Sequence, residues 1–179
     1  MKFKRCITVA GVLLLSPLLG IVVSRTPAMA ICLTVVHDGS FEQQTSGTVS
    51  TPWIAEGRAG IDIGRGYSYD GNNNAWARNI TGWNAVRQPV QLTGGVPYHL
   101  TIAVRTSSNV SAGYLGFRDS AQRPVAETRF GPLLSYQKLH VDFTPAQTGT
   151  FNVFAGFWAP NQDSWIQVDA VATACDDTP

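Results

Sequence analysis

The stretch from Gly82 to Ser107 limits the possible folds most, because it contains two runs in which side chains alternate between two sides. The residues sharing one side are Val86, Gln88, Val90 and Leu92 in the first run and Tyr98, Leu100, Ile102 and Val104 in the second. A period of two predicts half-buried β-strands. Gly94 and Gly95 lie between the runs and give the backbone the freedom that a tight reversal needs. The stretch predicts a β-hairpin with one face in a core, with Trp83 just before its first strand.

The rest of the chain continues this pattern in short runs rich in Val, Ile, Thr, Phe and Tyr, separated by Gly, Pro, Asn and Ser. No segment shows a helical period, which indicates an all-β sandwich or barrel. Strands are expected at 32–37, 52–55, 60–64, 75–80, 85–92, 97–105, 112–118, 125–130, 136–143, 150–158 and 165–173. Turns are expected between them, one of them at residues 160–163.

The N-terminus has the pattern of a secretory signal peptide. Basic residues at positions 2, 4 and 5 precede an uncharged apolar run over residues 6–23, and Ala28-Met29-Ala30 provides the small residues that signal peptidase requires. The prediction is therefore a signal peptide at residues 1–30, a single domain at residues 31–179 and a secreted protein. The alternative is an uncleaved membrane anchor, since the apolar run is nearly long enough to span a bilayer.

Removal of residues 1–30 changes the charge of the protein. The full chain has 13 basic and 12 acidic residues. Cleavage removes four of the basic residues and none of the acidic ones, so the mature chain carries a net charge of −3. A mildly acidic chain without a Lys/Arg cluster argues against nucleic acid as a partner and, after signal cleavage, against a membrane.

Two cysteines remain near the ends of the mature chain, Cys32 and Cys175. Outside the cell such a pair is expected to oxidise, so the sequence predicts a disulfide that closes almost the whole domain. The bridge would bring the first and last strands close together. Two free thiols or a metal site are the alternatives.

The C-terminal half predicts a second face that is unusual for a solvated surface. Opposite the apolar side chains lie His99, Thr101, Arg105, Tyr114, Gly116, Arg118, Lys138, His140, Asp142, Asn152, Phe154 and Trp158. Aromatic rings beside hydrogen-bonding groups suit a sugar, whose C–H face stacks on a ring while its hydroxyls bind polar side chains. The alternative places Phe154 and Trp158 under a loop or in a second core layer. Trp76, flanked by Ala75 and Ala77, is expected in the core.

Four motifs in order resemble carbohydrate-binding modules of the family 4/9/22 kind. They are Asp38-Gly39-Ser40-Phe41-Glu42, the run from Trp83 to Leu92, the run from Gly94 to Leu100, and Gln167-Val168-Asp169-Ala170-Val171. The resemblance covers nearly all of the mature chain and implies a galactose-binding-like jelly-roll β-sandwich of two antiparallel sheets. Ala85, Gly94 and Ala170 depart from the family pattern, which indicates a divergent member.

The same resemblance implies two kinds of site. Family members often hold a structural calcium between the opening and closing strands, and its ligands here would be Glu42 and Asp169 with nearby carbonyls. Alternatively, Glu42 caps a turn and Asp169 pairs with an arginine. In relatives the tryptophan of the second motif often lies in or beside the sugar cleft, which makes Trp83 a candidate contact. The predicted ligand-binding residues are Trp83, Arg105, Tyr114, Arg118, Phe154 and Trp158.

No template for catalysis is present. Gly66-Tyr67-Ser68-Tyr69-Asp70 lacks the glycine that completes a nucleophile elbow, and the three histidines have no metal-binding spacing. The leading hypothesis is a secreted, bacterial, non-catalytic protein that binds a polysaccharide or other glycan. The alternatives are an exported structural or protein-interaction protein with the same fold and a small glycan hydrolase or lyase, whose carboxylate pair would leave little local signature.

Overall fold

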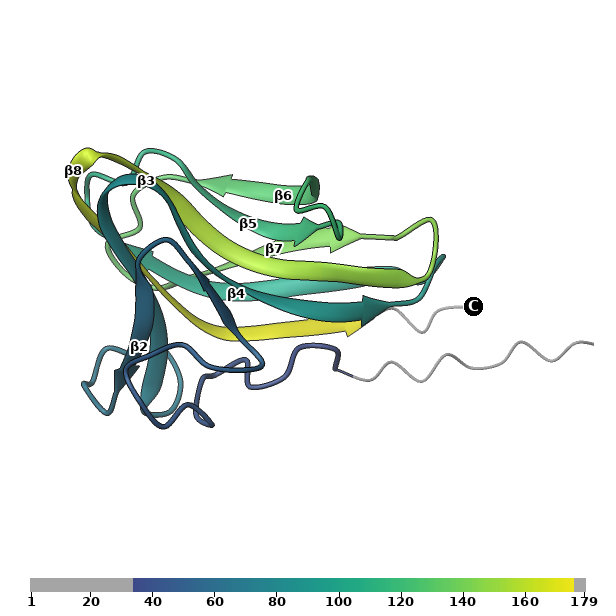
Figure 1. The fold of residues 1–179 in the computed structure, drawn as a ribbon, viewed down its shortest axis with the longest axis horizontal. Helices are drawn as coiled ribbons and strands as arrows, with labels where there is room; N and C mark the ends of the chain where they lie inside the picture. Colours follow the sequence, from purple (N-terminus) through teal and green to yellow (C-terminus); the bar gives the residue numbers. More distant parts are fainter. Residues whose placement is uncertain (1–33, 176–179) are drawn as a thin grey trace, which may run out of the picture.

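The computed structural model describes residues 34–175, and this part of the chain consists of strands, turns and loops without a helix (Figure 1). The strands are β1 (Ile54–Glu56), β2 (Ala59–Ile63), β3 (Asn73–Leu92), β4 (Tyr98–Thr106), β5 (Gly113–Arg118), β6 (Pro124–Phe130), β7 (Gln137–Phe143) and β8 (Gly149–Cys175). Within these residues nothing has the length and apolarity of a membrane-spanning helix. The predicted signal peptide and Cys32 lie outside the described residues, so cleavage and the disulfide remain predictions.

The two long strands β3 and β8 pair with each other along most of their length and each contributes to both layers of a sandwich. Their antiparallel register runs from Ala75↔Val168 to Leu92↔Gly149, with an irregularity between Asn79 and Thr81. Figure 1 shows β8 running along one layer, folding over at one end and returning in the other layer. The predicted strand pairs 75–80/85–92 and 150–158/165–173 are therefore the halves of β3 and β8. The fold-over of β8 contains Asn161, whose φ is 60°.

The first layer consists of β1, the C-terminal half of β3, the N-terminal half of β8, β5 and β6. The second layer consists of β2, the N-terminal half of β3, the C-terminal half of β8, β4 and β7. Alternate side chains of both layers meet in one core, in which Leu115, Phe117 and Phe157 face Leu100 and Ile102, all of them buried. The architecture is the predicted all-β jelly-roll sandwich.

The predicted hairpin between residues 82 and 107 is wrong, because β8 lies between β3 and β4. The C-terminal half of β3 belongs to the first layer and β4 to the second, so Gly94 and Gly95 lie in a connection between layers. Gly94 approaches the backbone of Gln147 so closely that a Cβ would lie 2.8 Å from the Cα of that residue. The two glycines do form a turn, but this turn connects strands of different layers and not two neighbouring strands of one sheet.

The predicted first strand is also wrong in its described part, because residues 34–37 form no strand. This segment is held by side chains. The buried Gln88 accepts a hydrogen bond from the His37 N–H and donates one to the His37 carbonyl, both at 2.7 Å. Just before His37 in the chain, the Val35 N–H donates to Thr173 Oγ1 at 3.2 Å. The beginning of the described chain therefore lies beside the end of β8, as the sequence predicts.

Candidate functional site

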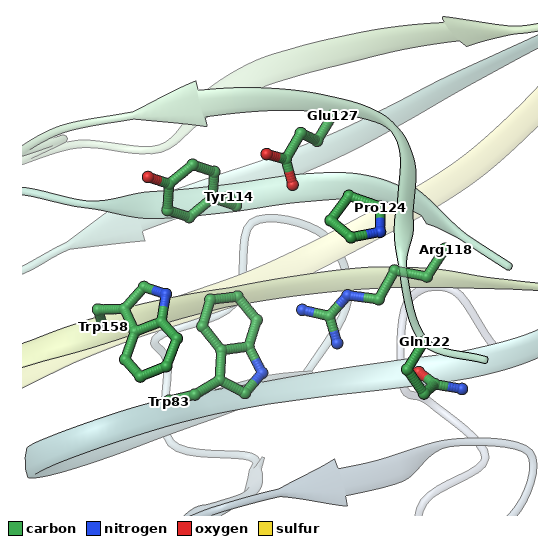
Figure 2. A pocket seen from close by; sticks show the side chains of 7 residues that line it. All are labelled: Trp83, Tyr114, Arg118, Gln122, Pro124, Glu127 and Trp158. Carbon is green, nitrogen blue, oxygen red and sulfur yellow. The ribbon is translucent and has the colours of Figure 1, made fainter.

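Five of the six predicted ligand-binding residues meet on the outer face of the first layer. Trp83 comes from β3, Tyr114 and Arg118 from β5, and Phe154 and Trp158 from β8. The register explains the gathering, since Trp83 pairs with Trp158 and Tyr114 pairs with Gly156 on adjacent strands. Figure 2 shows a groove on this face with the side chains of all of these residues except Phe154. Its volume is about 430 Å³, and it is lined by Trp83, Tyr114, Arg118, Gln122, Pro124, Glu127 and Trp158. We call it the first groove.

Aromatic rings form one side of the first groove. The Trp83 ring centroid lies 5.6 Å from that of Trp158 and 6.5 Å from that of Tyr114. Gly156 leaves room for the indole of Trp83 because it has no side chain. A Cβ at this position would lie 2.5 Å from Trp83 Cζ2. Trp158 is 53% exposed and presents a ring to solvent. This is the surface that a sugar ring can stack on.

Phe154 has a different place from the one its prediction as a ligand contact requires. Its side chain is fully buried, with the Arg118 guanidinium 3.9 Å above its ring and the Trp83 ring centroid 6.2 Å away. It therefore forms the floor that supports the groove. Such a cation–π contact is stronger where the guanidinium is shielded from water, and the Arg118 side chain is 12% exposed.

Glu56 is the residue that the sequence analysis did not single out and that organises this face. From β1 it accepts hydrogen bonds from Trp83 Nε1 at 2.7 Å, Arg87 Nε at 2.8 Å and Arg118 Nη1 at 3.0 Å. Its side chain is 20% exposed. One carboxylate thus fixes an indole and two guanidinium groups. The available signal was its rarity, as one of three glutamates and the one directly after the strand predicted at residues 52–55.

The turn between β5 and β6 supplies the other side of the groove, which the sequence analysis also missed. Asp119 Oδ1 accepts the backbone N–H groups of Ala121 and Arg123, each at 2.9 Å. These bonds and the Arg123 guanidinium lower the pKa of the Asp119 carboxyl. Gln122 lies inside this turn with a φ of 63°, and Glu127 follows on β6. The fixed turn therefore holds the Gln122 amide at the groove, and β6 adds the Glu127 carboxylate.

Arg105, the sixth predicted residue, lies elsewhere. It belongs to β4 in the second layer, where its guanidinium lies 5.2 Å from the Tyr136 ring centroid and 5.7 Å from that of Trp165. The face predicted as one surface is thus divided between the outer faces of two layers. Trp76, expected in the core, also lies partly exposed on the outer face of the second layer, while Ala75 and Ala77 are buried. Alternation separates the two sides of a strand without identifying its layer, which explains why Arg105 was grouped with residues of the first layer. Trp76 lies on the outer side because its neighbours Ala75 and Ala77 face the core.

The two predicted calcium ligands hold one loop. Glu42 Oε1 accepts the N–H groups of Asn72 and Asn73 at 2.8 and 2.7 Å. Asp169 Oδ2 accepts those of Tyr69 and Asp70 at 2.7 and 3.0 Å. Burial raises the pKa of the Asp169 carboxyl to about 6.

One oxygen of each carboxylate is thus already engaged by two backbone N–H groups. Residues 34–175 contain no cluster of three or more His, Cys, Asp or Glu side chains suited to a metal, so a site here would depend on backbone carbonyls. Calcium remains a prediction.

Comparison with solved structures finds proteins that share this fold. The chain is similar to the carbohydrate-binding module TmCBM61, solved with β-1,4-galactotriose, with a TM-score of 0.60 at 14% identity over 81% of this chain and 100% of that one. It is similar to a family 16 carbohydrate-binding module, with a TM-score of 0.58 at 15% identity over 78% and 99%. The fold is that of a carbohydrate-binding module.

Further comparisons set the limits of this similarity. An arabinose-bound α-L-arabinofuranosidase matches with a TM-score of 0.61 at 12% identity, over 79% of this chain and 26% of that one. The chain therefore spans about a quarter of that enzyme. No protein-family model and no curated protein matches the sequence. The resemblance to families 4 and 22 extends to solved members of both, at 15% and 14% identity, so the chain is a divergent example of the fold.

Proposed function

We propose that this protein is a secreted, non-catalytic glycan-binding protein and that it binds a neutral saccharide in the first groove. The observation that carries the proposal is the groove itself. Trp83 and Trp158 present rings on one side, and Gln122 and Glu127 present hydrogen-bonding groups on the other. An interaction surface for a protein partner would more often be a flat patch. The aromatic residues here border a hollow instead.

The charges lining the first groove favour a neutral ligand. Arg118 and Glu127 are the charged residues among its lining side chains, and they cancel. The charge of Arg118 is moreover already engaged by Glu56. A uronate or sulfate would meet the Glu127 carboxylate without gaining a free cation. Hydroxyl groups can use both the carboxylate and the Gln122 amide as partners.

The role of Glu56 supports binding without catalysis. A glycoside hydrolase needs two carboxyl groups free to exchange protons or attack the anomeric carbon. Both oxygens of Glu56 accept hydrogen bonds from Trp83, Arg87 and Arg118. Glu127 is the other carboxylate at the groove. This arrangement provides a positioned acceptor and not a reacting pair.

Affinity electrophoresis and titration calorimetry test the proposal. The neutral probes are β-1,4-galactan with its trisaccharide, and xylan, because similar modules were solved with galactotriose and as a xylan-binding domain. We expect retardation by at least one glycan from a neutral-glycan panel that includes these probes. Trp158→Ala, an exposed position, should weaken that binding at least tenfold and leave the melting temperature nearly unchanged. Leu134→Ala, at an exposed apolar residue outside the groove, is the control.

Three outcomes would count against parts of the proposal. A folded protein that binds no neutral glycan, or one whose binding survives Trp158→Ala, would exclude the first groove as the site. Release of reducing sugar from a bound glycan would exclude a non-catalytic role. Export of the full chain with a mature N-terminus other than Ile31, or no export at all, would contradict the proposed signal peptide.

A further inference from the structure

A second and larger groove lies on the outer face of the second layer. Its volume is about 630 Å³, within the range of small-molecule sites. It is lined by Gly47, Arg58, Ile61, Asp62, Arg65, Tyr67, Trp76, Arg78, Arg105, Trp165, Ile166 and Gln167. Inward-facing residues of this layer fill the core, so this second groove opens on the other side of the sheet from the core. Nothing in the proposed function involves it.

The register of four strands places the groove's side chains in two rows. In one row Gly60 of β2 pairs with Trp76 of β3, Trp76 pairs with Gln167 of β8, and Gln167 pairs with Arg105 of β4. In the other row Arg78 pairs with Trp165, and its N–H donates to the Arg58 carbonyl at 3.0 Å. Two indoles therefore lie diagonally on neighbouring strands, with arginines beside each.

The floor of the second groove is held rigidly by polar contacts. Gln167 Oε1 accepts hydrogen bonds from Nε and Nη2 of Arg105, the first at 2.8 Å. Tyr136 and Trp165 flank the same guanidinium. Gly60 leaves room for Trp76, because a Cβ there would lie 2.5 Å from Trp76 Cζ2. The ring and the guanidinium are thus positioned before any ligand arrives.

The groove has more positive than negative charge. Four arginines line it, and two carboxylates stand near them, Asp62 at 3.7 Å from Arg65 Nε and Asp163 in an ion pair with Arg78. In the described part of the chain, the ion pairs of this face do not include Arg58, although its charge helps to lower the pKa of the Asp163 carboxyl. Arg65 is 68% exposed. Guanidinium groups bind carboxylates and sulfates in a bidentate geometry.

We propose that the second groove binds an acidic saccharide, whose sugar ring stacks on Trp76 or Trp165 while its anionic group engages Arg58 and Arg65. The aromatic surface suits the C–H face of a pyranose, and the excess of arginine selects the charge. A carboxylated sugar and a sulfated sugar share this chemistry. The proposal is independent of the first groove, which lies on the opposite layer.

Titration calorimetry of the purified protein with three probes tests the proposal. Tetragalacturonate carries carboxylates, its fully methyl-esterified form has the same backbone without charge, and a κ-carrageenan tetrasaccharide carries sulfates only. We expect at least one acidic probe to bind at least tenfold more tightly than the esterified one. That affinity should fall as NaCl rises from 50 to 500 mM. Whichever acidic probe binds identifies the anionic group.

Matched variants assign the site. Arg58→Gln/Arg65→Gln should weaken binding of the acidic probe at least tenfold. Arg123→Gln/Arg129→Gln removes the same charge from the first layer and should have little effect. Trp76→Ala should weaken binding as well, whereas Trp158→Ala should not. Melting curves show that each variant is folded. Retained binding of a first-groove ligand adds the same check for Arg58→Gln/Arg65→Gln and for Trp76→Ala.

The proposal is overturned if neither acidic probe binds at millimolar concentration, or if the esterified probe binds equally well. It is also overturned if the first-layer double variant weakens binding as much as Arg58→Gln/Arg65→Gln does. Loss of acidic-probe binding in Trp158→Ala with retention in Trp76→Ala would place the ligand in the first groove instead. Failure of neutral glycans to bind would bear on the proposed function and not on this one.

Discussion

On the outer face of the first layer, two arginines converge on one partly buried carboxylate, whereas on the second layer four arginines share two aspartates. Glu56 binds Arg87 and Arg118 and also fixes Trp83. The second face leaves Arg58 without such a partner and Arg65 at 3.7 Å from its own. Both faces carry two tryptophans beside the groove. Aromatic content is therefore the same on both faces, and under the two proposals it is the number of counter-ions that determines which charge each face accepts.

The largest difference between the faces should appear when Glu56 is replaced. Glu56→Gln leaves two guanidinium groups without their counter-ion and places an amide against three donors. Breaking a largely buried charge network of this kind typically costs about 3 kcal/mol. We expect a loss of roughly that size in the free energy of unfolding from urea denaturation, together with loss of first-groove binding.

The exposed pair on the second face provides the contrast to Glu56. Arg78 and Asp163 are each about half exposed, so Asp163→Asn should lower the unfolding free energy far less than Glu56→Gln does. Equal losses in the two variants would show that Glu56 is one more surface charge. The expectation that the first face depends on a buried ion pair and the second on an exposed one would then be wrong.

A matched pair of glycines gives the next smaller effect. Gly156→Ala would place a Cβ 2.4 Å from Ala85 Cβ and 2.5 Å from Trp83 Cζ2, and Gly60→Ala would place one 2.5 Å from Trp76 Cζ2. Each change must displace an indole, and such overpacking typically costs about 1–3 kcal/mol. We expect Gly156→Ala to reduce neutral-glycan binding only and Gly60→Ala to reduce acidic-saccharide binding only.

Calorimetry with both kinds of probe, alongside urea denaturation, checks this separation. Gly131→Ala is the control, since a Cβ there meets nothing within 4 Å. If one glycine variant weakened both activities equally, the two grooves would be coupled or the loss would be one of general stability. The shift of tryptophan fluorescence should report indole displacement in both variants.

The sequence predicted the faces of strands well and their partners poorly. Alternation correctly placed Leu100, Ile102 and Phe117 inside and Tyr114 and Trp158 outside. It could not assign β4 and β5 to different layers, because pairing depends on contacts distant in the chain. Arg105 was therefore grouped with Arg118.

Contacts between strands also explain the residues that were missed. Glu56 becomes important only because β1 pairs with β3 and brings the carboxylate beside Arg87 and Trp83. Trp76 was assigned to the core because Ala75 and Ala77 flank it, yet it is these two alanines that face inward. Phe41 and Trp53, two buried aromatic residues from another segment, form part of the same core, with ring centroids 4.8 Å apart. The sequence around Trp76 does not show which distant residues fill the core.

The smallest effect should come from freeing Arg78. Its guanidinium is engaged by Asp163 on the exposed surface, with Nε 2.9 Å from Oδ1. Asp163→Asn raises the charge of the second face and releases Arg78 toward the ligand. We expect the affinity for the acidic probe to rise about two- to threefold with a steeper NaCl dependence, while neutral-glycan binding stays the same.

The pH dependence of this effect follows from the ion pair. Hydrogen bonding to Arg78 lowers the pKa of the Asp163 carboxyl. The pair is therefore intact above the usual carboxyl range and is lost only as the pH falls through the lowered pKa. The advantage of Asp163→Asn over the wild type should accordingly be constant from pH 5 to 8. Asp142→Asn removes the same charge at β7, where Asp142 bonds His99 at 2.6 Å, and should raise the affinity less. Equal gains in the two variants would mean that the ligand senses only net charge and that Arg78 does not contact it.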